Sequence, residues 1–499
     1  MDQKTSLPLP SFPHLAWIIA GILFIAAWFL WFAGKGLLAP FSGDDMMNLH
    51  GYLMKPSRAL LLDNLRYWSP SYRPLGGLFY VPLYHLFGLN PLPFRTVCFV
   101  ILGLNLVLTF WFCRLASGKT HVAYLATFLV SYHAWFIDLY YSSGTIYELL
   151  CFFFYFGAFI LYIRIRQAGR IPSAMESVGL AALYVCALNA KEMAVTLPLF
   201  LTLYEWIYHT PRMTARSAIA WPIREGRFAL VTAALTIPYV IGKLSPSSAF
   251  TKISSYDVSV SPGKFLDAFH LYLNPLLYQN HFFRDPNTIR LLIAMLLLAI
   301  LSRSRALIFS WFFLTLSLLP VAFIAHYAAF FQYIPSVGWA LYAAVSLTMI
   351  LDALFRAMRK LWPAFPKLEM GCRGAAVLVG VLACLLAPLH ARESARTYRG
   401  FLSVQPPARQ MAAELLRVQP RMKRGARVLF AGDPVPRDTY FLLYVTRLTY
   451  NDMAIEVTKT DQPPAAGVNP EEYDSAFSYN NGRLDPMPMR QKDGSAGPR

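Results

Sequence analysis

Apolar segments close to the length of a membrane span recur along most of this chain. They lie at roughly 14–33, 92–114, 120–137, 145–163, 175–190, 193–209, 227–242, 287–301, 305–324, 333–354 and 374–390. A helix needs about 20 mainly apolar residues to cross a bilayer. With 56% hydrophobic and only 14% charged residues, the chain is also too apolar for a soluble protein of its length. The sequence therefore predicts an all-α polytopic membrane protein with about 11 transmembrane helices.

The distribution of basic residues predicts how these helices are oriented. The formal net charge is +18, but Arg and Lys are spread over the connections between apolar segments, for example at 164–170, 212–227 and 356–373. This pattern follows the positive-inside rule and does not indicate a nucleic-acid partner. We therefore expect a cytoplasmic N-terminus and an extracytoplasmic C-terminus. The short connections favour a bacterial inner membrane.

Two long loops are expected on the outer face of a transmembrane domain that covers residues 1–390. The first, residues 34–91, is far longer than an ordinary connection, so we expect it to contain helices of its own. Its alternating Leu and basic residues predict helix lying in the membrane interface and broken near Pro56. The second, residues 243–286, turns strongly aromatic and is also expected to lie on the membrane.

The chain after the last apolar segment is more polar and divides into two parts. Residues 391–461 are predicted to form a small extracytoplasmic domain, in which Arg427 to Gly432 reads as a short buried strand and Tyr440 to Val445 as a second helix or strand. Residues 462–499 are rich in Pro, Gly, Asn and Ser, which is typical of disorder.

Two adjacent carboxylates, Asp44 and Asp45, follow the first apolar segment, where removing them from water is costly. One interpretation is structural, because Asp is favoured where a helix begins. The alternative is catalytic, and it is favoured by other ionisable residues, including Asp138, that the same topology places on the outer face. The residues expected to bind substrate are Arg73, Glu148, Lys191, Glu192, His281, Arg284, His326 and Tyr333.

These residue types suit glycosyl transfer from a lipid-phosphate sugar. A carboxylate takes the proton from an acceptor hydroxyl as its oxygen attacks the anomeric carbon, while Arg or Lys stabilises the departing phosphate. No His, Asp and Glu residues have convincing metal-ligand spacing, so no cofactor is expected and a divalent metal is an alternative that the sequence does not indicate. The absence of a phosphate-binding Gly-rich motif disfavours a nucleotide-sugar donor.

Several short motifs occur in a defined order along the chain. They are Gly43-Asp44-Asp45, Ser71-Tyr72-Arg73-Pro74-Leu75, Phe87-Gly88-Leu89-Asn90-Pro91, His133 with Gly144 and Glu148, Lys191-Glu192 with Leu197-Pro198, and Tyr333-Ile334-Pro335-Ser336-Val337-Gly338. This series resembles the GT-C superfamily of membrane glycosyltransferases, and most of all its protein O-mannosyltransferase-like group, including the membrane half of tetratricopeptide-linked O-mannosyltransferases. The resemblance covers residues 14 to about 345.

The resemblance implies an acidic catalytic base in the first outer loop, at the position of Asp44 or Asp45. It also implies a polyprenyl-phosphate sugar donor, an acceptor protein or glycan, and membrane lipid around the helices. Two motifs depart from the pattern: Phe94-Arg95 stands where relatives commonly carry Phe-His, and Phe330-Phe331 replaces a frequent Arg-Tyr pair. The residue that contacts the donor phosphate in relatives is therefore not identified in this chain. Arg73, Arg284 and His326 are the candidates to replace it.

Two other classes of protein stay open. A transporter or flippase of a lipid-linked or anionic substrate would also contain ionisable residues, but these are expected near the bilayer midplane on interrupted helices. A nonenzymatic membrane scaffold would need none of them.

Overall fold

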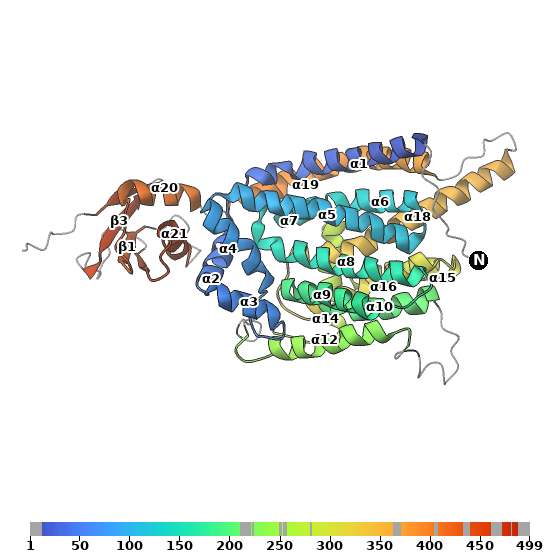
Figure 1. Cartoon of the computed structure of the whole chain (residues 1–499). Coiled ribbons are helices and arrows are strands. Elements are labelled where there is room, and N and C mark those ends of the chain that lie inside the picture. Colours follow the sequence, from blue (N-terminus) through green and yellow to red (C-terminus); the bar gives the residue numbers. More distant parts are fainter. Residues whose placement is uncertain are drawn as a thin grey trace, which may run out of the picture.

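The computed structural model describes residues 12–209, 221, 224–248, 252, 257–279, 282–362, 371–403, 408–432, 440–460, 472–480 and 482–487. It consists of a bundle of long helices with a small α/β unit at one end (Figure 1). The bundle contains α1 (Phe12–Ala33), α5 (Pro91–Ser117), α6 (Thr120–Ser131), α7 (Ile137–Tyr141), α8 (Ile146–Gln167), α9 (Ala174–Ala190), α10 (Leu197–Tyr204), α12 (Arg227–Lys243), α14 (Pro262–Leu276), α15 (Asp285–Leu301), α16 (Arg305–Leu316), α17 (Leu319–Ala322), α18 (Tyr333–Leu361) and α19 (Cys372–Ser403).

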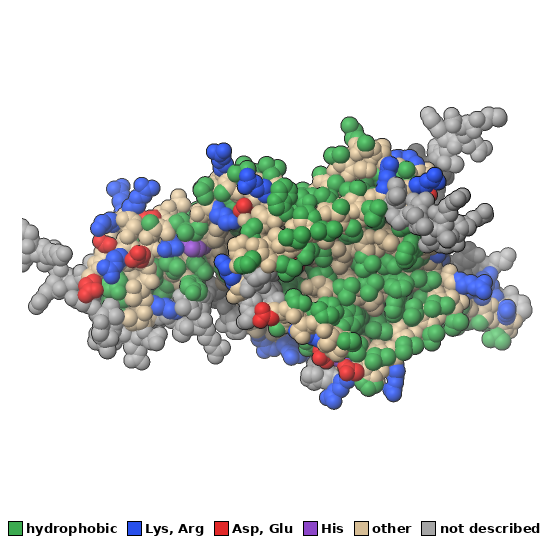
Figure 2. Space-filling view, turned by 90° about the horizontal axis from the view of Figure 1, so that it is seen from below, with side chains coloured by type: hydrophobic (Ala, Val, Ile, Leu, Met, Phe, Trp, Pro, Cys, Tyr) green, Lys and Arg blue, Asp and Glu red, His purple; other side chains and the backbone are tan. Residues whose placement is uncertain are grey.

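Six helical segments among the described residues are long and apolar enough to cross a membrane. They are Ile19–Leu38, Pro91–Ser117, Ser143–Gln167, Arg305–Ala322, Ala329–Leu361 and Cys372–Phe401. A seventh is added if Thr120–Ser131 and Ala134–Tyr141, which are bent by 49°, count as one span. Apolar side chains cover the length of the bundle in Figure 2, and Lys and Arg side chains gather towards its ends. The protein is thus a multi-pass integral membrane protein.

The prediction of about 11 spans is wrong for four segments. The apolar runs at 175–190, 227–242 and 287–301 form helices of 17 residues each, and the run at 193–209 contains α10, which has 8. A helix of 17 residues is only about 26 Å long. Apolar content alone therefore overestimated the number of spans, because helix length also depends on where each helix ends.

Aromatic side chains fill the centre of the bundle. Phe112 of α5 lies 4.9 Å from Phe156 and 5.2 Å from Phe159 of α8, measured between ring centroids. Phe313 of α16 lies 5.8 Å from Phe112 and 6.0 Å from Phe156, again between ring centroids. All four rings are fully buried, so they pack three helices around one core.

Three further helices lie at one end of the bundle: α2 (Gly43–Leu53), α3 (Ser57–Leu65) and α4 (Leu75–Phe87) (Figure 1). The helix break predicted near Pro56 is confirmed, since α2 ends at Leu53 and α3 begins at Ser57. Proline fixes its own backbone and restricts the residue before it, which explains the separation. The location of these helices in the membrane interface stays a prediction.

The α/β unit contains α20 (Ala408–Val418), β1 (Arg427–Ala431), α21 (Phe441–Tyr450), β2 (Glu456–Thr460), β3 (Ser475–Asn480) and β4 (Arg483–Pro486). Its sheet has the order β2-β1-β3-β4, in which β1 is parallel to both neighbours and β3 is antiparallel to β4. Strands with neighbours on both sides are the most buried. The predicted strand is confirmed as β1, and the segment after Tyr440 forms α21.

The predicted disorder of 462–499 is wrong for β3 and β4. Phe477 and Leu484 are buried in these strands, and β3 pairs with β1. The average composition of the tail does not reveal these two short strands. The backbone of β3 is satisfied by β1, which is distant in sequence, and β4 in turn pairs with β3. Residues 461–471 and 488–499 lie outside the described residues.

The α/β unit contacts the first predicted outer loop directly. Tyr84 Oη of α4 donates a hydrogen bond to the carbonyl oxygen of Leu448 at 2.6 Å. Arg447 of α21 donates from Nη1 to His50 Nε2 of α2 at 3.1 Å. The C-terminal unit and the first loop therefore lie at the same end of the bundle.

Candidate functional site

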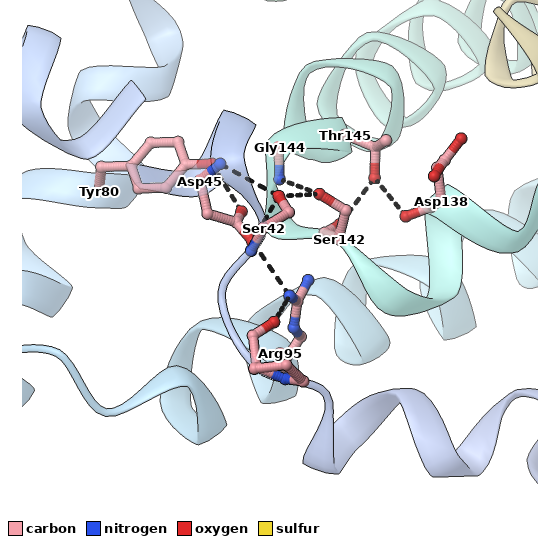
Figure 3. A network of polar contacts seen from close by, with 9 residues as sticks. Ser42, Asp45, Tyr80, Arg95, Asp138, Ser142, Gly144 and Thr145 are labelled. Atoms are coloured by element: carbon pink, nitrogen blue, oxygen red, sulfur yellow. Dashed lines mark hydrogen bonds and ion pairs between the residues drawn. The ribbon is translucent and has the colours of Figure 1, made fainter. Parts of the chain in front are cut away.

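The two adjacent carboxylates have different surroundings. Asp45 is fully buried and forms a capping box with Ser42: its carboxylate accepts from the Ser42 backbone N–H at 2.8 Å, and its own N–H donates to Ser42 Oγ at 3.1 Å. Arg95 donates to the same carboxylate at 3.1 Å and Tyr80 at 3.3 Å (Figure 3). The geometry thus supports the structural interpretation for Asp45.

Asp44 instead faces a cavity of about 430 Å³. The same cavity is lined by Asp138 from α7, by Phe330 just before α18, and by Thr397 and Phe401 from the end of α19. Asp44 is exposed and Asp138 is half-buried. Two carboxylates from separate segments therefore share one cavity, and either one is placed to accept a proton from a bound molecule.

A tight turn before α8 holds Asp44 in this position. Ser142 Oγ lies 2.9 Å from Ser42 Oγ and accepts from the Gly144 N–H at 3.0 Å (Figure 3). Thr145 Oγ1 donates to the backbone oxygen of Asp138 at 3.2 Å. A Cβ atom at Gly144 would lie only 2.9 Å from the Cβ of Asp44, so only glycine allows this close approach.

A buried group of charged residues adjoins this cavity. Lys191 forms an ion pair with Glu148, and these side chains are 1% and 4% exposed. The Lys191 ammonium lies 4.3 Å from the ring centroid of Phe331 and 4.7 Å from that of Phe330, which also lines the cavity. Burial, and then the charge of Arg73, lower the pKa of Lys191, whereas the adjacent Glu148 carboxylate opposes this shift by favouring the charged ammonium.

Arg73 belongs to the same group. It donates from Nη2 to Glu192 Oε1 at 2.6 Å and from Nε to Glu192 Oε2 at 3.3 Å. Burial opposes ionisation of Glu192, but Arg73 and Lys191 still hold its pKa below the usual value. Arg73 has a φ of +40°, which is uncommon for a side-chain-bearing residue. Such backbone strain persists only where the surroundings fix it, so Arg73 is held in one position.

Of the other described residues expected to bind substrate, only His326 lies near the charged group. His326 is half-buried with its ring 5.5 Å from Phe331, and burial followed by the charges of Lys191 and Arg73 lowers its pKa. Tyr333 is buried and stacks on Phe152 at 4.5 Å, which indicates a packing role. Arg284 is exposed at the start of α15, and no contact among the described residues joins it to the cavity. His281 lies outside the described residues.

The geometry adds three residues to those expected from sequence. Asp138 was placed on the outer face but not among the substrate-binding residues, and Ser142 and Arg95 had no assigned role. Arg95 is 1% exposed and donates to the Pro40 carbonyl at 2.7 Å as well as to Asp45. It therefore holds the start of α2 and does not face the cavity. The one sequence signal for Arg95 is that the pair Phe94-Arg95 stands where the resembled family commonly has Phe-His.

No protein-family model matches this sequence, and no curated protein is similar enough to count as a relative. The residues around the cavity are therefore the features that indicate a function.

Proposed function

We propose that this protein is a membrane glycosyltransferase of the GT-C type, which moves a sugar from a polyprenyl-phosphate donor to an acceptor hydroxyl on the extracytoplasmic face. The observation that carries the proposal is the cavity shared by Asp44 and Asp138 beside the buried cations Arg73 and Lys191, at one end of a membrane-embedded bundle. Transfer from a lipid phosphate needs a base and a cationic phosphate site close to the membrane surface.

In this proposal Asp44 is the base. The acceptor oxygen forms a bond to the anomeric carbon, the bond from that carbon to the phosphate oxygen breaks, and the electron pair leaves with the phosphate. The hydroxyl proton passes to the Asp44 carboxylate. Asp138, on the opposite segment of the same cavity, orients the acceptor or the sugar through hydrogen bonds.

Arg73 and Lys191 are the proposed phosphate contacts. Each is already paired with a carboxylate, Glu192 and Glu148 respectively, so a phosphate would replace or share those partners. The second oxygen of Glu148, Oε2, is buried with no hydrogen-bond partner among the described residues, so this pair is incompletely satisfied. A sugar hydroxyl group of the donor would relieve that cost by donating a hydrogen bond to Oε2.

An apolar groove between α10 and α12 suits the isoprenoid chain of the donor. It consists of two adjoining hollows of about 470 and 330 Å³ that share Pro198, Leu199 and Ala233. One hollow reaches Val240 and Ile241, close to Lys243, which donates to the carbonyl oxygens of Ser69 and Ser71. These carbonyls precede Arg73 in the chain, so the groove leads towards the proposed phosphate site.

The test is sugar transfer by the purified protein from defined polyprenyl-phosphate sugars, in parallel with flipping or uptake assays in proteoliposomes. We expect transfer that is lost in Asp44→Asn and retained in Asp63→Asn. The control removes a half-buried carboxylate on α3 that pairs with the exposed Lys55 and lies outside the lining of the cavity. Flipping or uptake without transfer would reject this proposal in favour of a transporter. The absence of both activities would favour a scaffold.

A further inference from the structure

We propose that Asp267, His270 and Asp285 bind a divalent transition-metal ion, with Zn²⁺ as the best fit. One ligand atom from each of these side chains lies within 4.8 Å of the other two. Asp267 and His270 are three residues apart on α14, so they share one face of that helix, and Asp285 is the first residue of α15. Two helices thus present one nitrogen and two carboxylate oxygens to a common point.

The contact between His270 and Asp285 has the separation of two ligands of one metal. His270 Nε2 lies 3.1 Å from Asp285 Oδ1. Bonds of about 2.0 to 2.2 Å to a shared zinc place neighbouring ligand atoms about 3 to 3.5 Å apart. Although the two atoms are close, Nε2 is buried and makes no hydrogen bond among the described residues. A metal between the two side chains would satisfy this nitrogen.

The ligands differ in exposure in a way that suits metal entry. The His270 side chain is 13% exposed, whereas that of Asp285 is 59% exposed. Asp267 is also exposed. The imidazole is therefore held in place by packing, and the two carboxylates lie where an ion can arrive from water. Three protein ligands leave at least one coordination position for water.

The connection between the two helices is already closed by Asn274. Asn274 Nδ2 donates to the Phe283 carbonyl at 2.9 Å, and the Phe283 N–H donates to Asn274 Oδ1 at 2.9 Å. Asn274 Nδ2 also donates to the carbonyl oxygen of His270 at 3.1 Å. Asn274 therefore connects the helical turn that carries His270 to the residues just before α15. Because the ligands are brought together without metal, binding an ion costs little ordering of the chain.

The ligand chemistry selects the kind of ion. Mg²⁺ and Ca²⁺ prefer sites made of oxygen atoms alone, whereas an imidazole nitrogen favours Zn²⁺ and related transition metals. The bound ion would fasten α14 to α15 within the predicted outer loop 243–286. This role does not depend on sugar transfer.

The experiment uses the full-length protein in detergent, purified without a histidine tag, and measures zinc bound per chain together with the melting temperature. We expect one bound zinc per chain, a higher melting temperature with zinc, and no competition from excess Mg²⁺. His270→Ala and Asp285→Asn should each weaken zinc binding by more than about tenfold, since even residues that only support a ligand cost 10- to 100-fold.

Two further variants keep the test decisive. Asp267→Asn changes an exposed side chain, so it should weaken zinc binding without loss of folding. His85→Ala removes an exposed histidine from α4 and should bind zinc as the wild type does. Zinc binding unchanged in His270→Ala and Asp267→Asn, or no zinc bound by the wild type, would overturn the proposal and leave only a close contact between His270 and Asp285.

Discussion

Asp45 and Arg95 form a buried ion pair, with 3.1 Å between Asp45 Oδ2 and Arg95 Nη2 and side chains that are 0% and 1% exposed. This contact separates the roles of two neighbouring carboxylates. Asp45 is used to begin α2 and to neutralise Arg95, and Asp44 is left to face the cavity. Adjacent residues at a helix start point in different directions, which makes this division of roles possible.

Asp45→Asn should destabilise the protein by about 3 kcal/mol, because it leaves the Arg95 charge buried without its partner. Thermal melting in detergent measures the effect. The matched control is Asp63→Asn, which removes the partner of Lys55, a side chain that is 41% exposed. That variant should cost less than about 1 kcal/mol. Equal melting of the two variants would contradict a structural role for the buried pair.

Asp44→Asn should lower the rate of sugar transfer by at least about 100-fold, the range expected when a general base is lost. Its melting temperature should stay close to that of the wild type, since Asp44 is exposed and lies outside the capping box. Asp138→Asn, measured alongside, identifies the base. A larger loss of rate in Asp138→Asn than in Asp44→Asn would exchange the two roles.

Gly144→Ala should reduce transfer by displacing Asp44, because the new Cβ would lie 2.9 Å from the Asp44 Cβ and 3.0 Å from Ser142 Oγ. The control is Gly157→Ala in α8, where nothing lies within 4 Å of the added Cβ. In a helix interior, alanine is favoured over glycine by about 1 kcal/mol, so Gly157→Ala should be neutral or stabilising. Full activity of Gly144→Ala would argue against the proposed position of Asp44.

Arg73→Ala should raise the KM for the lipid-phosphate donor by an amount equivalent to about 1 to 3 kcal/mol, the range for a charge-assisted contact. Arg73→Lys should restore only part of it, since lysine cannot reproduce a two-nitrogen contact. Arg284→Ala, which changes an exposed cation at the start of α15, should leave the KM unchanged. A KM that rises in Arg284→Ala and stays unchanged in Arg73→Ala would instead indicate that the phosphate binds at the start of α15.

Acid should weaken the contact between α2 and α21. Burial and the charge of Arg447 lower the pKa of His50 from 6.5 to about 4. Between these values the unfolded chain binds more protons than the folded chain, so stability falls as the pH falls through this window. Because His50 is only half-buried, solvent screening reduces the expected loss to about 1 kcal/mol.

The measurement for this contact is the melting temperature of the wild type and of His50→Gln at about pH 7 and about pH 4.5. Glutamine can still accept a hydrogen bond from Arg447 but does not titrate. The wild type should therefore lose more stability in acid than His50→Gln. An equal loss in both proteins would show that another group causes the acid sensitivity.

Local properties of the sequence determined the class of this protein. Long apolar runs predicted a helical membrane protein, Pro56 marked the break between α2 and α3, and the apolar residues after Arg427 predicted β1. Such features follow from the sequence because hydrophobicity and backbone restriction act over a few neighbouring residues. The number of long spans did not follow, since helix ends at positions such as Lys191 depend on the packed surroundings.

The tertiary structure alone decided which residues meet. Asp45 pairs with Arg95, which lies 50 residues away, and Asp44 shares a cavity with Asp138, which comes from a different helix. His270 and Asp285 likewise meet only because α14 turns back onto the start of α15. Contacts of this kind have no fixed spacing in the sequence, because the path of the folded chain sets the distance between side chains. The sequence therefore determined which chemical groups were available, and the fold decided which of them act together.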